Sequence, residues 1–466
     1  MLSVMCGGLI VLPSVYSVNN MPIVSVAHAE VKTYVGTGKY IMSDFENQNI
    51  AQQRAIDRAL RDAQRQSGEY LQTYSRSING KLTNDEISTI TNNIVEVLEA
   101  NCIPQPFEQN GESGLMYKAT VKVKIDTNGV RAWLKRDEQD RATLVNQNKA
   151  EQQADDTNDL QVEDLRKRAQ NATTDAERER IRAEYQQADN EFLANQKYKE
   201  GNRLAFQGNY SNAIPLYNEA IKLNPQYEEA YINRGNCYRY LKNYDAAIAD
   251  YSKAINLNPN EAAYYSNRGN SYYKIQKYTQ AMADFNKAIE LNPKFWRTYY
   301  NRGLLYYDLE KYKEAIADYT KLIKIKSNYV LAYDNRGVAY YKMNDYNAAA
   351  ADFTKAISLN PTEPLYYYHR GLSYDKMENY SAAIADFTKA IELKPQDEDE
   401  YYFRRGVAYA LFDNLVQAIK DFDKAIELSP NNGRYYKLRG LCYQQMGDNV
   451  NAQADFDKAR QLGYND

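Results

Sequence analysis

Side chains that commonly catalyse reactions or bind metals are scarce in this sequence of 466 residues. It contains two histidines, His28 and His369, which is too few for a histidine-based metal site. The run from Gly36 to Gly38 is too short for a phosphate-binding loop. Acidic residues are abundant, but no pattern singles out a catalytic pair. The sequence therefore predicts no catalytic residue, no metal site and no cofactor.

A regular row of asparagines offers a chemistry of binding instead. We call it the asparagine row, and its members follow one another at equal steps along the chain: Asn233, Asn267, Asn301 and Asn335. A side-chain amide both donates and accepts hydrogen bonds, so evenly spaced amides can hold the backbone of an extended peptide without reading its sequence. The same position later holds His369, Arg404 and Leu438, so we expect the second half of the row to select a different partner.

Three tyrosines follow the asparagine row at a fixed distance. They are Tyr273, Tyr307 and Tyr341, each six residues beyond an asparagine. Their rings can pack against apolar or aromatic side chains of a bound partner. The alternative is that they belong to the protein's own core, where large rings are usually buried.

Both sets belong to a pattern that recurs eight times from Ala194 to the end of the sequence. Its glycines keep the same step as the asparagines, except that the step from Gly371 to Gly406 is longer by one: Gly201, Gly235, Gly269, Gly303, Gly337, Gly371, Gly406 and Gly440. Most units end in Asn-Pro or a variant of it, which stops a helix because proline forces the preceding residue out of the helical conformation. A constant period of roughly 34 residues predicts an α-solenoid, in which each helix pair buries its apolar face only against its neighbours.

The order of glycine, aromatic, alanine and proline within each unit resembles the tetratricopeptide repeat (TPR). Ala247 and Ala254, twelve and nineteen residues beyond Gly235, stand where that family has small residues. The resemblance covers the chain from Ala194 to its end. It implies stacked antiparallel helix pairs with a concave groove, lined by the asparagine row, in which a protein or peptide segment binds. The row also has a simpler interpretation, since Asn-Arg-Gly can be a common local sequence of this helix turn.

A second regularity concerns charge pairs inside the units. Seven units carry Arg directly before the glycine and Asp directly before the aromatic residue of the second helix. The first unit has neither, because Glu200 and Leu216 occupy these positions. Since both residues are present together or absent together, we predict seven structural Arg–Asp pairs that join the two helices of a unit.

Overall charge gives no reason to expect nucleic acid or an anionic membrane as partner. The chain has 58 basic and 61 acidic residues and a net charge of −3. Its cysteines Cys237 and Cys442 occupy equivalent places in distant units, so we expect free buried thiols instead of a disulfide.

Residues 1–29 are predicted to be an export signal. They contain no Lys, Arg, Asp or Glu and end in Ala27-His28-Ala29, a pattern that suits signal peptidase, although the usual basic start is missing. A membrane anchor is the alternative, but Pro13 and Pro22 break the apolar runs, which are too short to span a bilayer. We therefore expect an exported protein of the bacterial periplasm or cell envelope, with no membrane span after cleavage.

Residues 30–135 are predicted to form a small α+β domain. Strands are expected at Tyr34–Met42, Ile94–Leu98 and Tyr117–Asp126, with a helix at Asn47–Tyr70 between the first two. The helix presents a ridge of alanines at four-residue spacing, Ala51, Ala55, Ala59 and Ala63, while Arg54, Arg58, Arg61 and Asp62 are expected to stay in water. The order of strand, alanine-rich helix opening with Asn49-Ile50-Ala51, and Ile/Val-rich strands resembles the N-terminal domain of flagellar assembly protein T and related envelope lipoproteins. That resemblance implies an envelope location.

Residues 136–193 are predicted to be a polar linker that is helical or partly disordered. Its middle, Asn146 to Asp159, is too polar to bury much surface. A sparse apolar series, which includes Val162, Leu165 and Ala169, leaves a dimerising coiled coil as the alternative to a simple connector.

The expected protein is mostly α-helical: an α-solenoid of eight helix pairs (194–466), preceded by a small α+β domain and a helical linker. Our first functional hypothesis is a non-enzymatic exported adaptor that binds an extended segment of another protein in the groove. The second is an assembly factor of the envelope or of a surface apparatus, in which the N-terminal domain carries the specificity and the repeats act as a spacer.

Overall fold

The computed structural model describes residues 31–43, 45–77, 82–109, 112–126, 130, 133–134, 138–394 and 399–464. The predicted export signal therefore lies outside the described residues. The chain divides into two compact units between Asn260 and Glu261. The predicted linker and the first two repeats thus belong to the same unit as the α+β elements, and the later repeats form a unit of their own.

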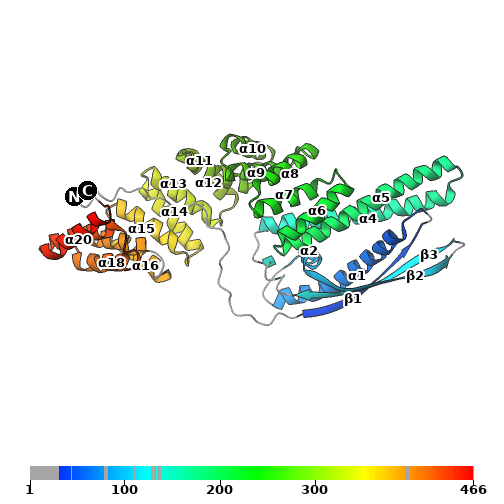
Figure 1. Ribbon diagram of the computed structural model, residues 1–466, viewed down its shortest axis with the longest axis horizontal. Helices are drawn as coiled ribbons and strands as arrows, with labels where there is room; N and C mark the ends of the chain where they lie inside the picture. Colours follow the sequence, from blue (N-terminus) through cyan, green and yellow to red (C-terminus); the bar gives the residue numbers. More distant parts are fainter. Residues whose placement is uncertain are drawn as a thin grey trace. The chain divides into compact units, whose positions relative to one another are not determined.

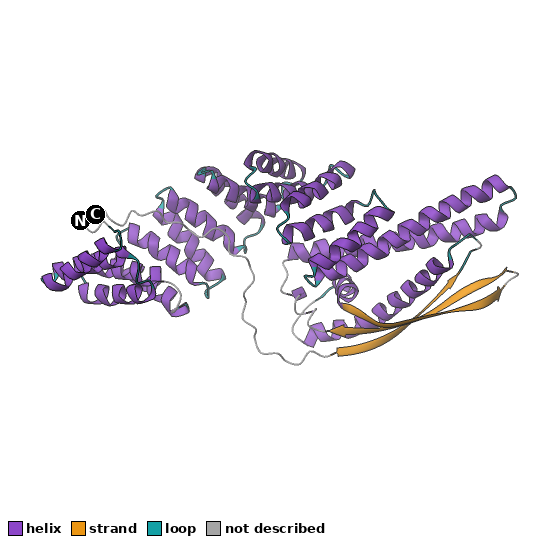
Figure 2. Ribbon diagram, viewed as in Figure 1, coloured by secondary structure: helices purple, strands orange, loops and turns teal. Residues whose placement is uncertain are grey.

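The α+β elements form an antiparallel sheet with helices on one side (Figure 2). Their bounds are β1 (Val31–Ile41), α1 (Gln48–Ser77), α2 (Asn84–Ile94), β2 (Val95–Gln109) and β3 (Glu112–Asp126). The strand order is β1-β3-β2, so β3 lies in the centre. Alternation along β3 confirms the half-buried strand: Ala119, Val121, Val123 and Ile125 are buried, while Lys118 and Lys122 point to the other face.

Two parts of this region differ from the sequence prediction. The strand expected at Ile94–Leu98 is much longer, because β2 continues through Pro104 and Pro106. Prolines are tolerated there since β2 is an edge strand, and only one of its sides needs backbone donors. The helix α2 was not predicted, although Thr83 and Glu86 form a capping box at its start.

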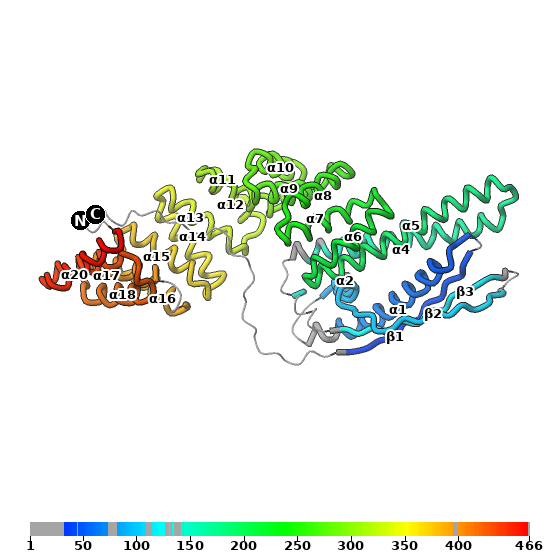
Figure 3. The backbone as a smooth tube through the Cα atoms, in the orientation of Figure 1, coloured from blue at the N-terminus to red at the C-terminus, as the bar shows by residue number. Residues whose placement is uncertain are grey.

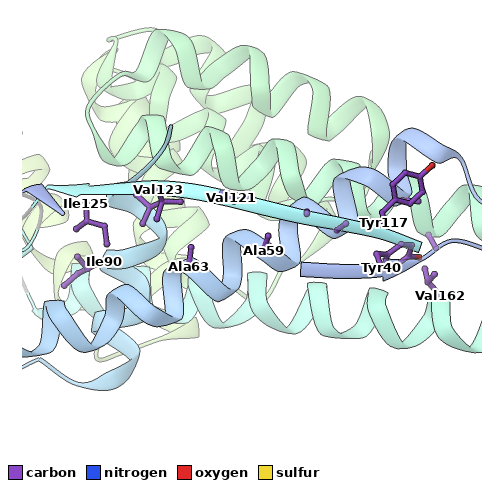
Figure 4. Close-up of a cluster of buried hydrophobic side chains, with 14 of the residues drawn as sticks. Tyr40, Ala59, Ala63, Ile90, Tyr117, Val121, Val123, Ile125 and Val162 are labelled. Carbon is purple, nitrogen blue, oxygen red and sulfur yellow. The ribbon is translucent and has the colours of Figure 1, made fainter. Parts of the chain in front are cut away.

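The predicted alanine ridge of α1 lies directly on the sheet. Ala51, Ala55, Ala59 and Ala63 are fully buried, and Figure 4 shows Ala59 and Ala63 next to Val121 and Val123 of β3. The approach is so close that a Cβ atom at Gly36 of β1 would lie 2.0 Å from the carbonyl oxygen of Ala59. Glycine is therefore required at this crossing of helix and strand.

The predicted linker forms two long helices, α4 (Glu138–Asn171) and α5 (Asp175–Phe206), which run side by side (Figures 1 and 3). Val162, Leu165, Ile181 and Tyr185 on these helices belong to the same hydrophobic cluster as α1 and the sheet. The partly disordered alternative for residues 146–159 is therefore not what the structure shows. These polar residues stay helical because α4 is docked along α5 and α1.

Docking of α4 and α5 also overturns the expectation that Arg54 is in water, and it partly covers Arg58 and Arg61. Arg54 is 1% exposed and donates to Asn158 of α4 (2.5 Å) and Asp189 of α5 (3.2 Å). Arg58 and Arg61 both contact Asp159 of α4. The face is polar because it contacts other polar helices, and the sequence of α1 alone gives no sign of those contacts.

Repeated helix pairs make up the rest of the described chain, which confirms the predicted α-solenoid. The first two pairs lie in the N-terminal unit: α5 with α6 (Tyr210–Leu223), and α7 (Glu228–Tyr240) with α8 (Tyr244–Leu257). The other six form the C-terminal unit: α9 (Ala262–Lys274), α10 (Tyr278–Leu291), α11 (Trp296–Asp308), α12 (Tyr312–Ile325), α13 (Val330–Lys342), α14 (Tyr346–Leu359), α15 (Pro364–Lys376), α16 (Tyr380–Leu393), α17 (Asp399–Leu411), α18 (Leu415–Leu428), α19 (Gly433–Gln445) and α20 (Asn449–Gln461).

The repeat glycines hold the two helices of each pair close together. In α11, for example, a Cβ atom at Gly303 would lie 2.6 Å from a ring carbon of Tyr319 in α12. The turn between the helices uses a left-handed residue, which is glycine in the first and last repeats but Lys242, Gln276, Glu310, Asn344, Glu378 or Asp413 in the other six. Cys237 and Cys442 are buried and free, as predicted.

Candidate binding surface

The asparagine row lies on the side of the first helices that faces away from the second helices. In α7, Gly235 contacts Tyr251 of α8. Asn233 is two residues earlier, and at about 100° per residue it lies about 200° around the helix from that contact. We call this side the inner face, defined by the position of Asn233 and its equivalents Asn267, Asn301, Asn335, His369, Arg404 and Leu438 in later repeats.

The predicted Arg–Asp pairs build the frame behind the inner face. All seven are present, with Nε and Nη2 donating to the two carboxylate oxygens at 2.6–2.8 Å, and the carboxylates are 5–6% exposed. The pairs are Arg234–Asp250, Arg268–Asp284, Arg302–Asp318, Arg336–Asp352, Arg370–Asp386, Arg405–Asp421 and Arg439–Asp455. Such two-point geometry is both strong and directional. Each pair therefore sets the angle between the helices of its repeat.

The same arginines also reach the preceding repeat, which the sequence analysis missed. In six of the seven arginines, the third nitrogen, Nη1, donates to a side chain of the previous second helix at 2.5–3.1 Å. The acceptors are Asn218, Asn286, Thr320, Thr354, Thr388 and Asp423. A signal was present, because the residue after the second-helix aromatic is a short polar one in all eight repeats. One guanidinium thus joins three helices and makes neighbouring repeats rigid relative to each other.

The first member of the asparagine row is already bound within the chain. Asn233 donates to the hydroxyl of Tyr198 (3.0 Å) and to Oδ1 of Asn202 (2.8 Å). Its own Oδ1 accepts from Nε2 of Gln147 in α4 (3.3 Å). The inner face of the first two repeats is therefore covered by α4.

The next three members are half-buried in the C-terminal unit. Asn335 donates to the hydroxyl of Tyr300 at 3.3 Å. Asn267 and Asn301 are likewise half-buried. These amides keep part of their surface accessible on three successive first helices.

Later positions on the inner face are filled by the chain's own side chains. His369 is 5% exposed, and its Nδ1 lies 2.8 Å from Oδ1 of Asp334 on the preceding first helix. Arg404 is 7% exposed and donates Nε to Glu400 at 2.6 Å. Leu438 is also buried. An imidazole and a guanidinium are longer than an amide, so they reach nearby carboxylates and leave less of themselves exposed.

The three tyrosines lie at the turns between helices, where the structure places them within the protein's own packing. Tyr273 contacts the ring of Tyr278 (centroids 6.1 Å apart) and donates its hydroxyl to Asp308. Tyr307 and Tyr341 pack edge-on against the tyrosines that begin their second helices, with centroids 5.3 Å apart in both cases. Burial raises the pKa of all three hydroxyls well above the usual value, so they remain neutral.

Family comparison agrees with this architecture. A tetratricopeptide repeat model matches residues 228–261, 331–363, 364–397 and 400–432, and a TPR repeat model matches residues 201–239, 269–310 and 303–344. The chain carries tetratricopeptide repeats. These repeats are in general non-catalytic modules that bind protein or peptide partners. No curated protein matches the chain.

Several solved TPR structures are similar to parts of the chain. YrrB, described as a TPR protein with an unusual peptide-binding site, shares 26% identity over 39% of this chain and 92% of its own, with a TM-score of 0.36. MamA from Desulfovibrio magneticus RS-1 shares 23% identity over 36% and 94%, with a TM-score of 0.35. A TPR protein from Parabacteroides merdae shares 22% over 54% and 99%, with a TM-score of 0.40.

The described residues contain neither a membrane-spanning helix nor a metal-binding cluster. None of their helices has the length and apolar character to cross a bilayer. Among the same residues, no group of three or more His, Cys, Asp or Glu side chains is arranged to bind a metal ion.

Proposed function

We propose that the protein is an exported, non-enzymatic adaptor that binds an extended segment of another protein along the inner face of its third to fifth repeats. The observation that carries the proposal is the set of three half-buried amides, Asn267, Asn301 and Asn335, at the same position of successive first helices. The export part rests on Ala27-His28-Ala29 and the uncharged segment before it.

Spacing supports an extended ligand. Packed helices lie about 8–10 Å apart, and an extended chain rises about 3.3 Å per residue. One amide per repeat therefore meets about every third residue of a bound segment. The arginines that join three helices hold this spacing constant, so the amides are already in position before a partner arrives.

Removing the side-chain amides of Asn267 and Asn301 tests the proposal. The full-length protein is crosslinked in envelope extract, and the captured partner is quantified for wild type and for Asn267→Ala/Asn301→Ala. We expect at least a tenfold loss of capture by the variant. A matched control, Asn328→Ala/Asn347→Ala, removes two exposed amides elsewhere and is expected to capture like wild type. Equal capture by wild type and the Asn267/Asn301 variant would refute the proposal.

An envelope assembly factor, with specificity in residues 30–135, is favoured by one observation. The sheet face opposite α1 is left open by the described elements of its unit, with Val35 49% and Ile103 61% exposed beside Lys118 and Lys122. Deletion of residues 30–135 would expose the buried polar face that α1 shares with α4 and α5. Val35→Asp/Ile103→Asp is therefore the better test: loss of capture here, with Asn267→Ala/Asn301→Ala unaffected, supports the assembly-factor role.

A further inference from the structure

Helix α4 presents a stripe of polar side chains to the inner face of the first two repeats. Gln147, Glu151 and Asp155 are four residues apart, so they share one side of the helix. Gln147 donates to Asn233 of α7. Glu151 accepts from Nδ2 of Asn202 at 2.6 Å, and Asp155 accepts from Nδ2 of Asn195 at 2.6 Å, both on α5. Asp155 also pairs with Lys199 of α5.

The side chains that contact this stripe occupy positions that recur in each repeat of the solenoid. Asn233 is the first member of the asparagine row, and Lys199 stands at the same position of the first repeat. Asn202 has its equivalents at Asn236 and Asn270, each one repeat further along the chain. Thus α4 occupies repeat positions, among them that of the asparagine row, whose equivalents recur on the first helices of the later repeats.

The middle of α4 is held almost entirely by polar contacts. Between residues 146 and 159, the buried side chains are Asn148, Asp155 and Asn158, whereas Ala150 and Ala154 are exposed. Apolar anchors flank this stretch: Leu144 and Val145 precede it, and Val162 and Leu165 follow it. Because hydrogen bonds of this kind can be exchanged for equivalent ones with another molecule or with water, this part of α4 is the replaceable part.

Two half-open pockets border the stripe. One, of about 250 Å³, lies between Gln147 and Glu151 on one side and Asn202, Asn233 and Tyr240 on the other. The second, of about 340 Å³, adjoins Asp155 and Asn195. Solvent therefore reaches part of the contact between α4 and the repeats, where water can replace its polar partners.

We propose that α4 is an internal occupant of the inner face of the first two repeats, and that the partner bound there is a helix carrying an amide and carboxylates four residues apart, as α4 does. This inference rests on the proposed function, since it assumes that the inner face binds protein segments. It adds the chemistry of the ligand and a condition for binding: the first half of α4 has to leave before a partner helix reaches Asn202 and Asn233.

A labelled peptide with the sequence of residues 138–163 is the probe, and the full-length protein is the receptor. Gln147→Ala/Glu151→Ala removes two contacts of the stripe, and Asn146→Ala/Thr157→Ala changes two exposed residues of α4 as the matched control. Fluorescence anisotropy measures the Kd of the peptide, and hydrogen exchange measures whether the amides of α4 are released.

We expect the Gln147/Glu151 variant to bind the peptide at least tenfold more tightly than wild type, with faster hydrogen exchange in α4. The control variant is expected to match wild type in both measurements. Adding Asn233→Ala to the Gln147/Glu151 variant should weaken the peptide at least fivefold. The proposal is overturned if α4 is released without a gain in peptide affinity, or if its exchange does not change. Neither result depends on Asn267 and Asn301, so the test of the adaptor function remains separate.

Discussion

Arg336 gives the sharpest test of how the repeats hold together. It donates to both oxygens of Asp352 at 2.7 Å and to Thr320 of the preceding repeat at 2.9 Å. Burial raises the pKa of the Asp352 carboxyl, and the adjacent guanidinium opposes that shift. Replacing Arg336 by Met keeps most of the apolar stem but leaves a buried carboxylate with no counter-charge.

The cost follows from the burial of the pair. Removing one partner of a fully buried ion pair costs about 3–5 kcal/mol. The arginine side chain is 16% exposed, so screening by solvent lowers the expected loss to about 2–3 kcal/mol. Asp352→Asn is expected to cost about 2 kcal/mol. Because the two residues act through the same contact, the double variant should lose about 1–3 kcal/mol less than the sum of the single losses.

Urea unfolding of the full-length chain, read by hydrogen exchange of amides in α12, α13 and α14, measures these losses locally. Such a readout is needed because long repeat arrays depart from two-state unfolding. As a control, Lys389→Met removes an exposed pair with Glu392 and should cost less than about 0.5 kcal/mol. Additive losses in the double variant, or equal losses for Arg336 and Lys389, would refute the claim that Arg336 couples three helices.

Three further predictions concern single positions. Glu310 has a φ of 58°, so Glu310→Gly should raise the free energy of unfolding by about 1 kcal/mol in urea titration, whereas Asn344→Gly should gain less because asparagine tolerates this conformation. Gly303→Ala should cost about 1–3 kcal/mol, because the added methyl group meets Tyr319; an unchanged midpoint would contradict the close helix contact. Burial raises the pKa of Glu151 to about 7 from 4.5, so its stabilising contribution is complete below about pH 4.5 and is lost as pH rises through about 7. The N-terminal unit should therefore lose about 1–3 kcal/mol over that range, and Glu151→Gln should flatten the loss in pH-dependent urea titration.

Features that repeat along the chain could be predicted from the sequence. The constant period of the glycines showed the helix pairs, and the joint presence of Arg and Asp in seven repeats identified their contact. Both predictions succeed for the same reason. Residues about half a repeat apart come from the two helices of one pair, so their geometry is local and recurs with the period.

The alanine ridge of α1 was predictable on similar grounds, since four-residue spacing places small side chains along one side of a helix. Its opposite side was not. Arg54 is charged and lies on a polar face, and nothing within α1 distinguishes a face in water from one that contacts Asn158 and Asp189, which are distant in the sequence.

The sequence by itself determined the solenoid and the positions of the amides on its first helices, because both follow from local periodicity. Only the tertiary structure decided which of those amides is covered by α4 and which are half-buried without it. The polar middle of α4 could equally have been a solvated connector, and its polarity is instead matched by Asn233, Asn202 and Lys199. These hydrogen bonds and this ion pair join common polar side chains that lie far apart in the sequence. They leave no period or motif in the sequence, and they separate the covered start of the inner face from the half-buried amides of the third to fifth repeats.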